Sequence, residues 1–161
     1  MLLGVVSDTH GHVPNTTRAV RMLESLQVAE VIHCGDIGSS DIVAMFATWP
    51  THFVYGNVDY DRAGLKIEIG RAGQTCCEVF GTLRREDREI AFLHGDDAGR
   101  LAQAIRGGRY ARVCHGHTHI SRIERVGETM VLNPGALFRA RPHSIAVVEL
   151  PALQATIVPL D

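Results

Sequence analysis

The first 55 residues alternate between apolar runs of strand length and segments with helical spacing, and this alternation restricts the possible folds more than any other feature of the chain. Three apolar runs predict strands: Met1–Ser7, Val31–Cys34 and Phe53–Tyr55. Apolar residues three and four positions apart predict helices over Asn15–Gln27 and Ile42–Trp49, the second capped by Ser39 or Ser40. A βαβαβ order implies parallel neighbouring strands joined by right-handed crossovers.

The rest of the chain is dominated by strand patterns. Eight further strands are predicted: Leu65–Ile69, Thr75–Thr82, Glu89–Leu93, Val113–His115, Ser121–Val126, Thr129–Leu132, Ser144–Leu150 and Ala155–Val158. One further helix, Ala98–Arg106, follows Asp96 or Asp97 as its cap. So many strands exceed one flat sheet in a chain of this length, so we expect an α/β fold: a two-sheet mixed β-sandwich flanked by helices, forming a single domain over residues 1–161.

Composition excludes several classes of protein. Of the 161 residues, 45% are hydrophobic and 21% charged, which allows a buried core and argues against disorder. The net charge of −2, without long runs of like charge, gives no indication of nucleic-acid or anionic-membrane binding. Neither a signal peptide nor a membrane-spanning segment is evident, and the four cysteines lack metal-site or disulfide spacing. We expect a cytoplasmic protein with reduced thiols.

Polar clusters follow five of the apolar runs directly. They are Ser7-Asp8-Thr9-His10-Gly11, Gly35-Asp36, Gly56-Asn57-Val58-Asp59, His94-Gly95-Asp96 and Gly116-His117-Thr118-His119. Ligands of open parallel sheets bind outside the carboxyl ends of the strands, so the five clusters are predicted to converge. For any single cluster taken alone, turn formation or helix capping is the favoured explanation, but five such clusters after successive strands favour a binding site.

The residue types indicate a metal site. Seven side chains could coordinate: Asp8, His10, Asp36, Asn57, His94, His117 and His119. Asp8 and His10 are two positions apart, as are His117 and His119, and such neighbours point to the same side of an extended chain. Seven ligands exceed one transition-metal site. If Asp36 bridges with both oxygens, they divide into two four-ligand sets that leave positions open for water and substrate.

The five motifs, in this order, resemble the signature of the calcineurin-like metallophosphoesterases, and most closely that of their small YfcE-type phosphodiesterase branch. Val31-Ile32-His33-Cys34-Gly35-Asp36 and Asn133-Pro134-Gly135 extend the resemblance over nearly the whole chain. The resemblance implies a sandwich fold and two metal ions. It assigns one ion to Asp8, His10, Asp36 and His119, and the other to Asp36, Asn57, His94 and His117.

These features together predict a phosphodiesterase that uses two divalent metal ions and a metal-bridging hydroxide as nucleophile. Two divalent ions against the two carboxylates leave about +2 of charge, which favours an anionic phosphate ester. Imidazole and oxygen ligation suits Mn²⁺, our first expectation, as well as Fe²⁺, Ni²⁺ or Zn²⁺. Asp36, Asn57 and His117 are the predicted catalytic residues. The expected partner is a small phosphate ester, with no nucleic acid and no membrane, and a homodimer is left open.

Two other functions fit the same sequence. A phosphomonoesterase or nucleotidase would use the same metal site, and a non-catalytic scaffold would share the fold, as in the retromer subunit. Loss of a ligand histidine would indicate a scaffold, whereas all seven predicted positions carry coordinating side chains.

The chain departs from the wider family at two positions. Val58 stands where many larger relatives have a histidine that assists the leaving group, so we expect a preference for good leaving groups. His12 is the nearest substitute and, with Asn57, a candidate substrate-binding residue, although an exposed turn histidine is the alternative. Asp96 stands where close relatives often have histidine, and we expect it to cap the following helix. Asp59 is expected to order the Asn57 turn.

Overall fold

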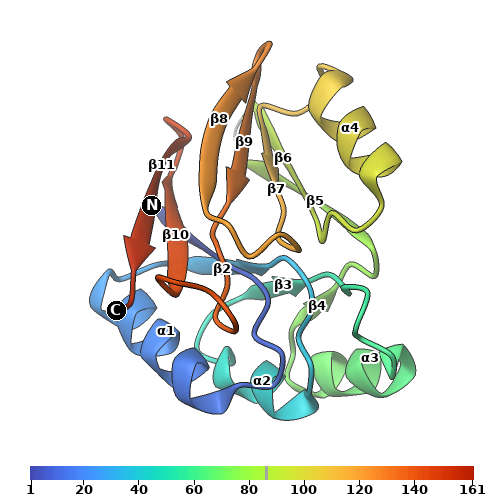
Figure 1. Cartoon of the computed structure of the whole chain (residues 1–161), viewed down its shortest axis with the longest axis vertical. Helices are drawn as coiled ribbons and strands as arrows, with labels where there is room; N and C mark the ends of the chain where they lie inside the picture. The colour runs from blue at the N-terminus through green and yellow to red at the C-terminus, as the bar shows by residue number, and fades with distance from the viewer. Residues whose placement is uncertain (86) are drawn as a thin grey trace.

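The computed structural model describes residues 1–85 and 87–161, which form two sheets with helices on their outer faces (Figure 1). The first sheet has the strand order β11-β10-β1-β2-β3-β4, and the second has the order β5-β6-β7-β9-β8. The strands of the first sheet are β1 (Leu2–Val6), β2 (Glu30–His33), β3 (Thr51–Phe53), β4 (Thr75–Cys76), β10 (Ser144–Glu149) and β11 (Gln154–Pro159). Those of the second are β5 (Phe80–Arg85), β6 (Arg88–Leu93), β7 (Arg112–Cys114), β8 (Arg122–Val126) and β9 (Thr129–Asn133).

Four helices complete the fold: α1 (Val13–Ser25), α2 (Ser40–Met45), α3 (Arg62–Arg71) and α4 (Ala98–Arg106). Helices α1, α2 and α3 line the outer face of the first sheet, and α4 packs against the second (Figure 1). The α/β sandwich flanked by helices that the sequence predicts is therefore confirmed.

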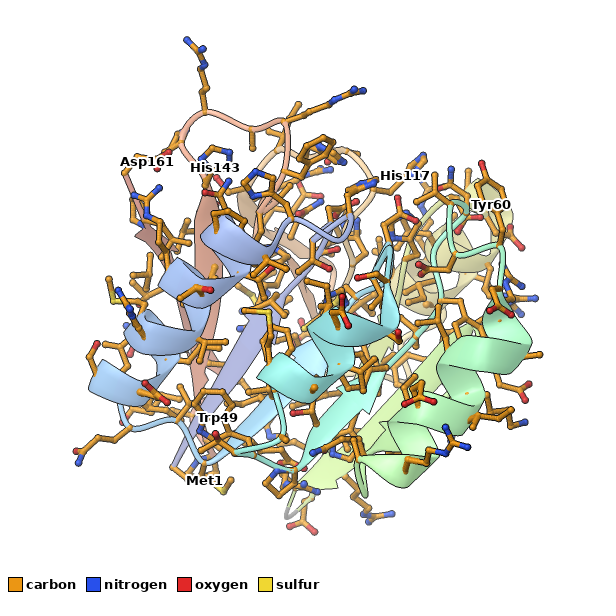
Figure 2. All side chains as sticks on the ribbon, turned by 90° about the horizontal axis from the view of Figure 1, so that it is seen from below. Met1, Trp49, Tyr60, His117, His143 and Asp161 are labelled. Carbon is orange, nitrogen blue, oxygen red and sulfur yellow. The ribbon has the colours of Figure 1, made fainter. Side chains whose placement is uncertain are left out.

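Parallel pairing runs through the middle of both sheets. Strands β1, β2, β3 and β4 pair in parallel, and β10 joins the other side of β1 in antiparallel register. In the second sheet β6, β7 and β9 are parallel, with antiparallel β5 and β8 at the edges. The loops after β1, β2, β3, β6 and β7 lie at the same end of the sandwich, where Asp36 after β2 contacts His94 after β6. Figure 2 shows His117 and Tyr60 at this end, and Met1 and Trp49 at the opposite one.

The apolar core has three layers. Side chains of β1 and β2 such as Val5 and Ile32 meet Phe92 and Leu132 of the second sheet in the layer between the sheets. A second layer lies under α1, α2 and α3, and a smaller one lies under α4. Because both faces of the central strands are buried, their sequences are continuous apolar runs rather than alternating ones.

One predicted strand is wrong. Leu65–Ile69 was expected to be extended, but it lies inside helix α3. Leu65 and Ile69 are buried one helical turn apart, while Ile67 between them is 55% exposed. The alternation of apolar residues mimics a strand, but the Asp61 carboxylate accepts the Gly64 amide at 2.9 Å and starts a helix instead.

Two other boundaries also differ. The predicted strand Thr75–Thr82 is divided, because Cys76 pairs with Phe53 in the first sheet whereas Phe80 pairs with Leu93 in the second. The second helix begins after Ser39, as expected, but ends at Met45. Among the described residues, no helix combines the length and the apolar character needed to cross a bilayer.

Candidate metal centre

The loops that follow β1, β2, β3, β6 and β7 carry all seven predicted ligands to one end of the sandwich. Five of these ligands have backbone φ angles in the left-handed region: Asp8 (54°), His10 (45°), Asp36 (54°), His117 (71°) and His119 (60°). Side chains with a Cβ enter this region at a cost of order 1 kcal/mol each, and such residues cluster at functional sites. The spacing argument assumed an extended chain at these positions, and this assumption is wrong. The backbone turns at residues in the left-handed region instead.

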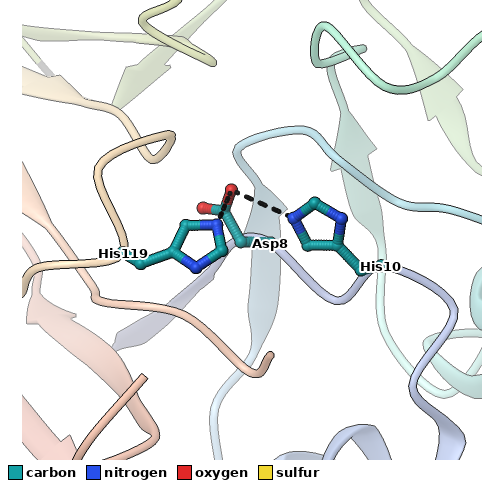
Figure 3. Close-up of side chains that lie close together, drawn as sticks. All are labelled: Asp8, His10 and His119. Atoms are coloured by element: carbon teal, nitrogen blue, oxygen red, sulfur yellow. Dashed lines mark ion pairs between the residues drawn. The ribbon is translucent and has the colours of Figure 1, made fainter. Parts of the chain in front are cut away.

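The two carboxylate oxygens of Asp8 have different surroundings. Its Oδ2 accepts hydrogen bonds from the Ser7 hydroxyl at 2.6 Å and from the His117 amide at 3.1 Å. Its Oδ1 is buried without a hydrogen-bond partner and lies 3.2 Å from His119 Nε2 and 3.7 Å from His10 Nε2. One oxygen is thus fixed by the protein and the other is directed at two imidazoles (Figure 3).

The two carboxylate oxygens of Asp36, on the neighbouring loop, also have different surroundings. Its Oδ1 accepts the Val58 amide at 3.0 Å. Its Oδ2 lies 3.4 Å from His10 Nε2 and 3.3 Å from His94 Nε2. A single oxygen, rather than the two expected from sequence, therefore faces one imidazole of each predicted ligand set.

Backbone carbonyls orient two of the imidazoles. His94 Nδ1 donates to the Cys34 carbonyl at 2.8 Å, and His119 Nδ1 donates to the Arg139 carbonyl at 3.3 Å. Each bond places a proton on Nδ1 and turns Nε2 toward the carboxylates. Histidine ligands of metals are commonly held in this way.

The side chains form two groups compatible with metal binding. Asp8, His10 and His119 make one group, and Asp8, Asp36 and His94 make the other; within each group the ligand atoms lie within 4.8 Å of one another. His10 Nε2, like Asp8 Oδ1, is buried without a hydrogen-bond partner. Buried polar atoms are normally paired, so two unpaired ones facing each other fit a bound cation.

The pKa shifts of Asp8, Asp36 and His94 also favour a bound cation. Burial would raise the pKa of Asp8, but the neighbouring His10 ring, the hydrogen bond from Ser7 and the charges of His94 and His119 bring that pKa below its ordinary value. The pKa of Asp36 is also lowered, since the His94 contact outweighs burial. Burial opposes charge on His94, yet the two carboxylates raise its pKa. The side chains of this centre therefore favour a positive charge between them.

The remaining predicted site residues lie at the rim. His94 Nε2 is 3.0 Å from Asn57 Oδ1, which brings the amide to the Asp36 side. The rings of His117 and His94 are 5.0 Å apart, but His117 belongs to neither group of clustered ligand atoms among the described residues. His12 begins α1, where its Nδ1 accepts the Asn15 amide at 3.3 Å.

Buried polar residues without metal-ligand spacing support the loops. Asp59 is 3% exposed and accepts the amides of Ile37, Gly38 and Gly56, so its expected role in ordering the Asn57 turn is confirmed. The helix cap expected at Asp96 is wrong, since Asp97 accepts the Arg100 amide instead.

Two further supports were not assigned from sequence. The Asn133 amide donates to the Gly116 carbonyl at 2.9 Å and bridges to Thr118. His33 is fully buried, and burial lowers its pKa to about 3. Its Nε2 lies 3.0 Å from Thr9 Oγ1, which links the loops after β1 and β2. In the sequence both residues stand in segments that carry the family resemblance, but residue spacing gives no indication of these contacts.

Comparisons with known proteins agree with this geometry. The family model described as the calcineurin-like phosphoesterase superfamily domain matches residues 1–152. A phosphodiesterase of Methanocaldococcus jannaschii is 33% identical over 138 residues, which cover 84% of this chain and 83% of that protein.

Solved structures share the fold. A structure described as a novel archaeal phosphodiesterase superposes with a TM-score of 0.90 at 28% identity, covering 99% of each chain. YfcE, a phosphoesterase from E. coli, superposes with a TM-score of 0.69 over 100% of each chain, and its 17% identity shows a common fold alone. The chain belongs to the calcineurin-like phosphoesterase superfamily and is a metal-dependent phosphoesterase.

Proposed function

We propose that this protein is a phosphodiesterase with a binuclear metal centre built from Asp8, His10, Asp36, Asn57, His94, His117 and His119. The observation that carries the proposal is the position of Asp36 Oδ2, which lies 3.4 Å from His10 Nε2 and 3.3 Å from His94 Nε2. One carboxylate oxygen thus faces an imidazole from each ligand set. The diester preference agrees with the 33% identical archaeal relative, which is named a phosphodiesterase.

The residues divide the work of holding two cations. Asp8, His10 and His119 would hold one ion, and Asn57, His94 and His117 the other, with Asp36 shared between them. When bound, two divalent ions supply a water activated as nucleophile and positive charge for the phosphoryl oxygens. Mn²⁺ remains our first expectation, with Fe²⁺, Ni²⁺ or Zn²⁺ as alternatives.

The chain itself keeps the ligands ready for that chemistry. The carbonyls of Cys34 and Arg139 hold Nδ1–H of His94 and His119, so both rings present an unprotonated Nε2 when they are neutral. The Ser7 hydroxyl donates to one oxygen of Asp8, and the Val58 amide donates to one oxygen of Asp36. Such fixed donors and acceptors reduce the reorganisation needed when substrate binds.

The site has no histidine at position 58 to protonate the leaving group. Val58 donates its backbone amide to Asp36 but has no side chain able to transfer a proton. His12 remains the proposed substitute; its Nδ1 is used by the Asn15 amide, which leaves Nε2 for contact with substrate. We therefore propose that esters with good leaving groups are hydrolysed fastest.

The decisive experiment is hydrolysis of bis(4-nitrophenyl) phosphate and of 4-nitrophenyl phosphate by metal-stripped protein reloaded with Mn²⁺, Ni²⁺ or Zn²⁺. We expect faster turnover of the diester. Preference for the monoester would support the phosphomonoesterase or nucleotidase alternative. Absence of turnover with every metal, at confirmed metal loading, would support a scaffold.

The cytoplasmic location, the single domain over residues 1–161 and the absence of a nucleic-acid partner stay predictions, as does a homodimer. The substrate proposed is a small phosphate ester.

A further inference from the structure

A cavity of about 200 Å³ has one of the seven predicted ligands, His94, among its described lining residues. It is lined in part by Tyr55, Arg62, Leu93, His94, Asp96 and Arg100. At about 30 Å³ per water, its volume corresponds to roughly seven water molecules, enough for a small substituent. A larger cavity of about 650 Å³ lies between α2 and α3, but none of the seven predicted ligands is among the described residues that line it.

Arg62 lines this small cavity, and its guanidinium is positioned by Tyr55 and by two backbone carbonyls. Its guanidinium carbon lies 5.4 Å from the centre of the Tyr55 ring, within the range of a cation–π contact. Its Nε and Nη2 each lie 3.4 Å from a backbone carbonyl, those of Asp59 and Gly56. The Tyr55 hydroxyl donates to the Arg62 carbonyl at 3.1 Å, so the same tyrosine fixes both the backbone and the side chain of this arginine.

The charge of Arg62 has no carboxylate partner within the described part of the chain. Arg100, the other cation of the cavity, faces Asp97 at 3.7 Å. Asp96 also lines the cavity, and its side chain forms no hydrogen bond or ion pair with another described residue. The cavity is therefore lined by one guanidinium without a carboxylate partner, that of Arg62, and by two carboxylates, of which Asp97 faces Arg100 and Asp96 is free to compete for Arg62.

We propose that the cavity beside His94 receives one ester substituent of the phosphodiester, and that Arg62 selects substituents carrying an anionic group, either carboxylate or phosphate. The proposal rests on the phosphodiesterase function proposed above. A guanidinium forms paired hydrogen bonds with either kind of anion, and its fixed stacking on Tyr55 reduces the entropy lost on binding. Asp96 would weaken this selection by repulsion.

The test uses three diesters with the same 4-nitrophenolate leaving group and different second substituents: propyl, 2-carboxyethyl and 2-phosphoethyl. We expect Arg62→Gln to lower the ratio of kcat/KM for either anionic diester to that for the propyl diester by at least tenfold. Asp96→Asn should raise this ratio. Arg71→Gln is the matched control, because Arg71 lies on the same helix and pairs with Glu68 at 2.7 Å, and it should leave the ratio unchanged.

A binding measurement provides a second readout on metal-free protein. In NMR spectra, 2-carboxyethyl phosphate should shift the Arg62 Nε–Hε resonance, identified by its loss in Arg62→Gln, more than propyl phosphate does. Equal shifts, or a proportional loss of kcat/KM for all three diesters in Arg62→Gln, would overturn the anionic selection while leaving the phosphodiesterase function intact. A wild-type protein that hydrolyses none of the diesters would instead overturn the proposed function.

Discussion

Asp36 Oδ2 lies 3.3 Å from His94 Nε2, although the two residues follow strands of different sheets. The contact joins the two halves of the sandwich at its functional end. It also places a carboxylate oxygen between imidazoles of both predicted ligand sets, since His10 Nε2 lies 3.4 Å from the same atom.

Replacement of Asp36 should therefore affect both metal positions. We expect Asp36→Asn to lose both ions together and to lower diester hydrolysis by at least about a hundredfold, because the neutral amide removes the shared charge. Elemental analysis of metal per chain, alongside the rate, measures this. Retention of two ions would show that Asp36 is not the bridge.

His12→Ala provides the matched control for metal content. His12 lies at the start of α1, and its ring is outside both groups of candidate ligands among the described residues. We expect the variant to keep the wild-type metal content. A metal loss comparable to that of Asp36→Asn would mean that the ligand assignment omits His12.

Asp59 should contribute strongly to stability without binding metal. Its buried carboxylate accepts three backbone amides, from Ile37, Gly38 and Gly56. Asp59→Ala leaves these donors unpaired and should lower the free energy of unfolding by about 3 kcal/mol, measured by urea denaturation of metal-free protein. Asp61→Ala, which removes an exposed helix cap three residues from its Gly64 partner, should cost only about 1 kcal/mol. Equal losses of stability in Asp59→Ala and Asp61→Ala would contradict the role of Asp59 in holding these loops.

Gly56 should be required for metal binding because of its close approach to Asp36. A Cβ added at Gly56 would lie 2.0 Å from Asp36 Oδ1 and 2.4 Å from the Asp36 backbone nitrogen. Gly56→Ala must displace this carboxylate, and we expect metal affinity to fall at least about tenfold in a competition titration with a chelator.

The control for Gly56 is another glycine of the same half of the molecule. Gly70 lies in α3, and a Cβ there meets no heavy atom within 4 Å. Gly70→Ala should leave metal affinity unchanged and raise stability by about 0.5–1 kcal/mol through helix propensity. Unaltered metal affinity in both variants would refute the steric argument.

His33 should make the stability of metal-free protein depend on pH. Burial lowers the pKa of His33 from 6.5 to about 3 in the folded protein. The folded state thus keeps this ring neutral, and below about pH 6.5 only the unfolded chain takes up the proton. Stability from this residue is fully present above pH 6.5 and falls with pH, with a slope approaching about 1.4 kcal/mol per unit.

The measurement compares wild type with His33→Gln. The difference between their free energies of unfolding should shrink as the pH is lowered from 7 toward 5, as expected when only one of them has the buried histidine. A difference that stays constant with pH would indicate that His33 binds its proton equally well in the folded and unfolded states, so that burial does not lower its pKa.

The initial βαβαβ order and the polar clusters at the strand ends can be predicted from the amino-acid sequence alone. Continuous apolar runs such as Met1–Ser7 predict buried parallel strands, and parallel pairing brings their carboxyl ends to one edge. Since His94 follows β6 of the other sheet, this physical rule alone predicts only that Asp8, Asp36 and Asn57 converge. It requires no knowledge of individual contacts.

Local pattern failed where tertiary contacts outweighed it. Leu65, Ile67 and Ile69 alternate like a strand, yet the Asp61 cap and burial of Leu65 and Ile69 against the first sheet stabilise a helix. The strand expected over Thr75–Thr82 divides because its two halves pair with different sheets. Neither choice is visible in periodicity, since both depend on partners distant in sequence.

Which carboxylate oxygens of the centre are available for binding depends on contacts that form in the folded protein. Ser7 and the His117 amide occupy Asp8 Oδ2, and the Val58 amide occupies Asp36 Oδ1, so each carboxylate has one oxygen directed inward. The left-handed backbone at Asp8 and Asp36 is likewise imposed by the packed loops. Hydrogen bonds between loops distant in sequence set these orientations, and residue spacing contains no information about them.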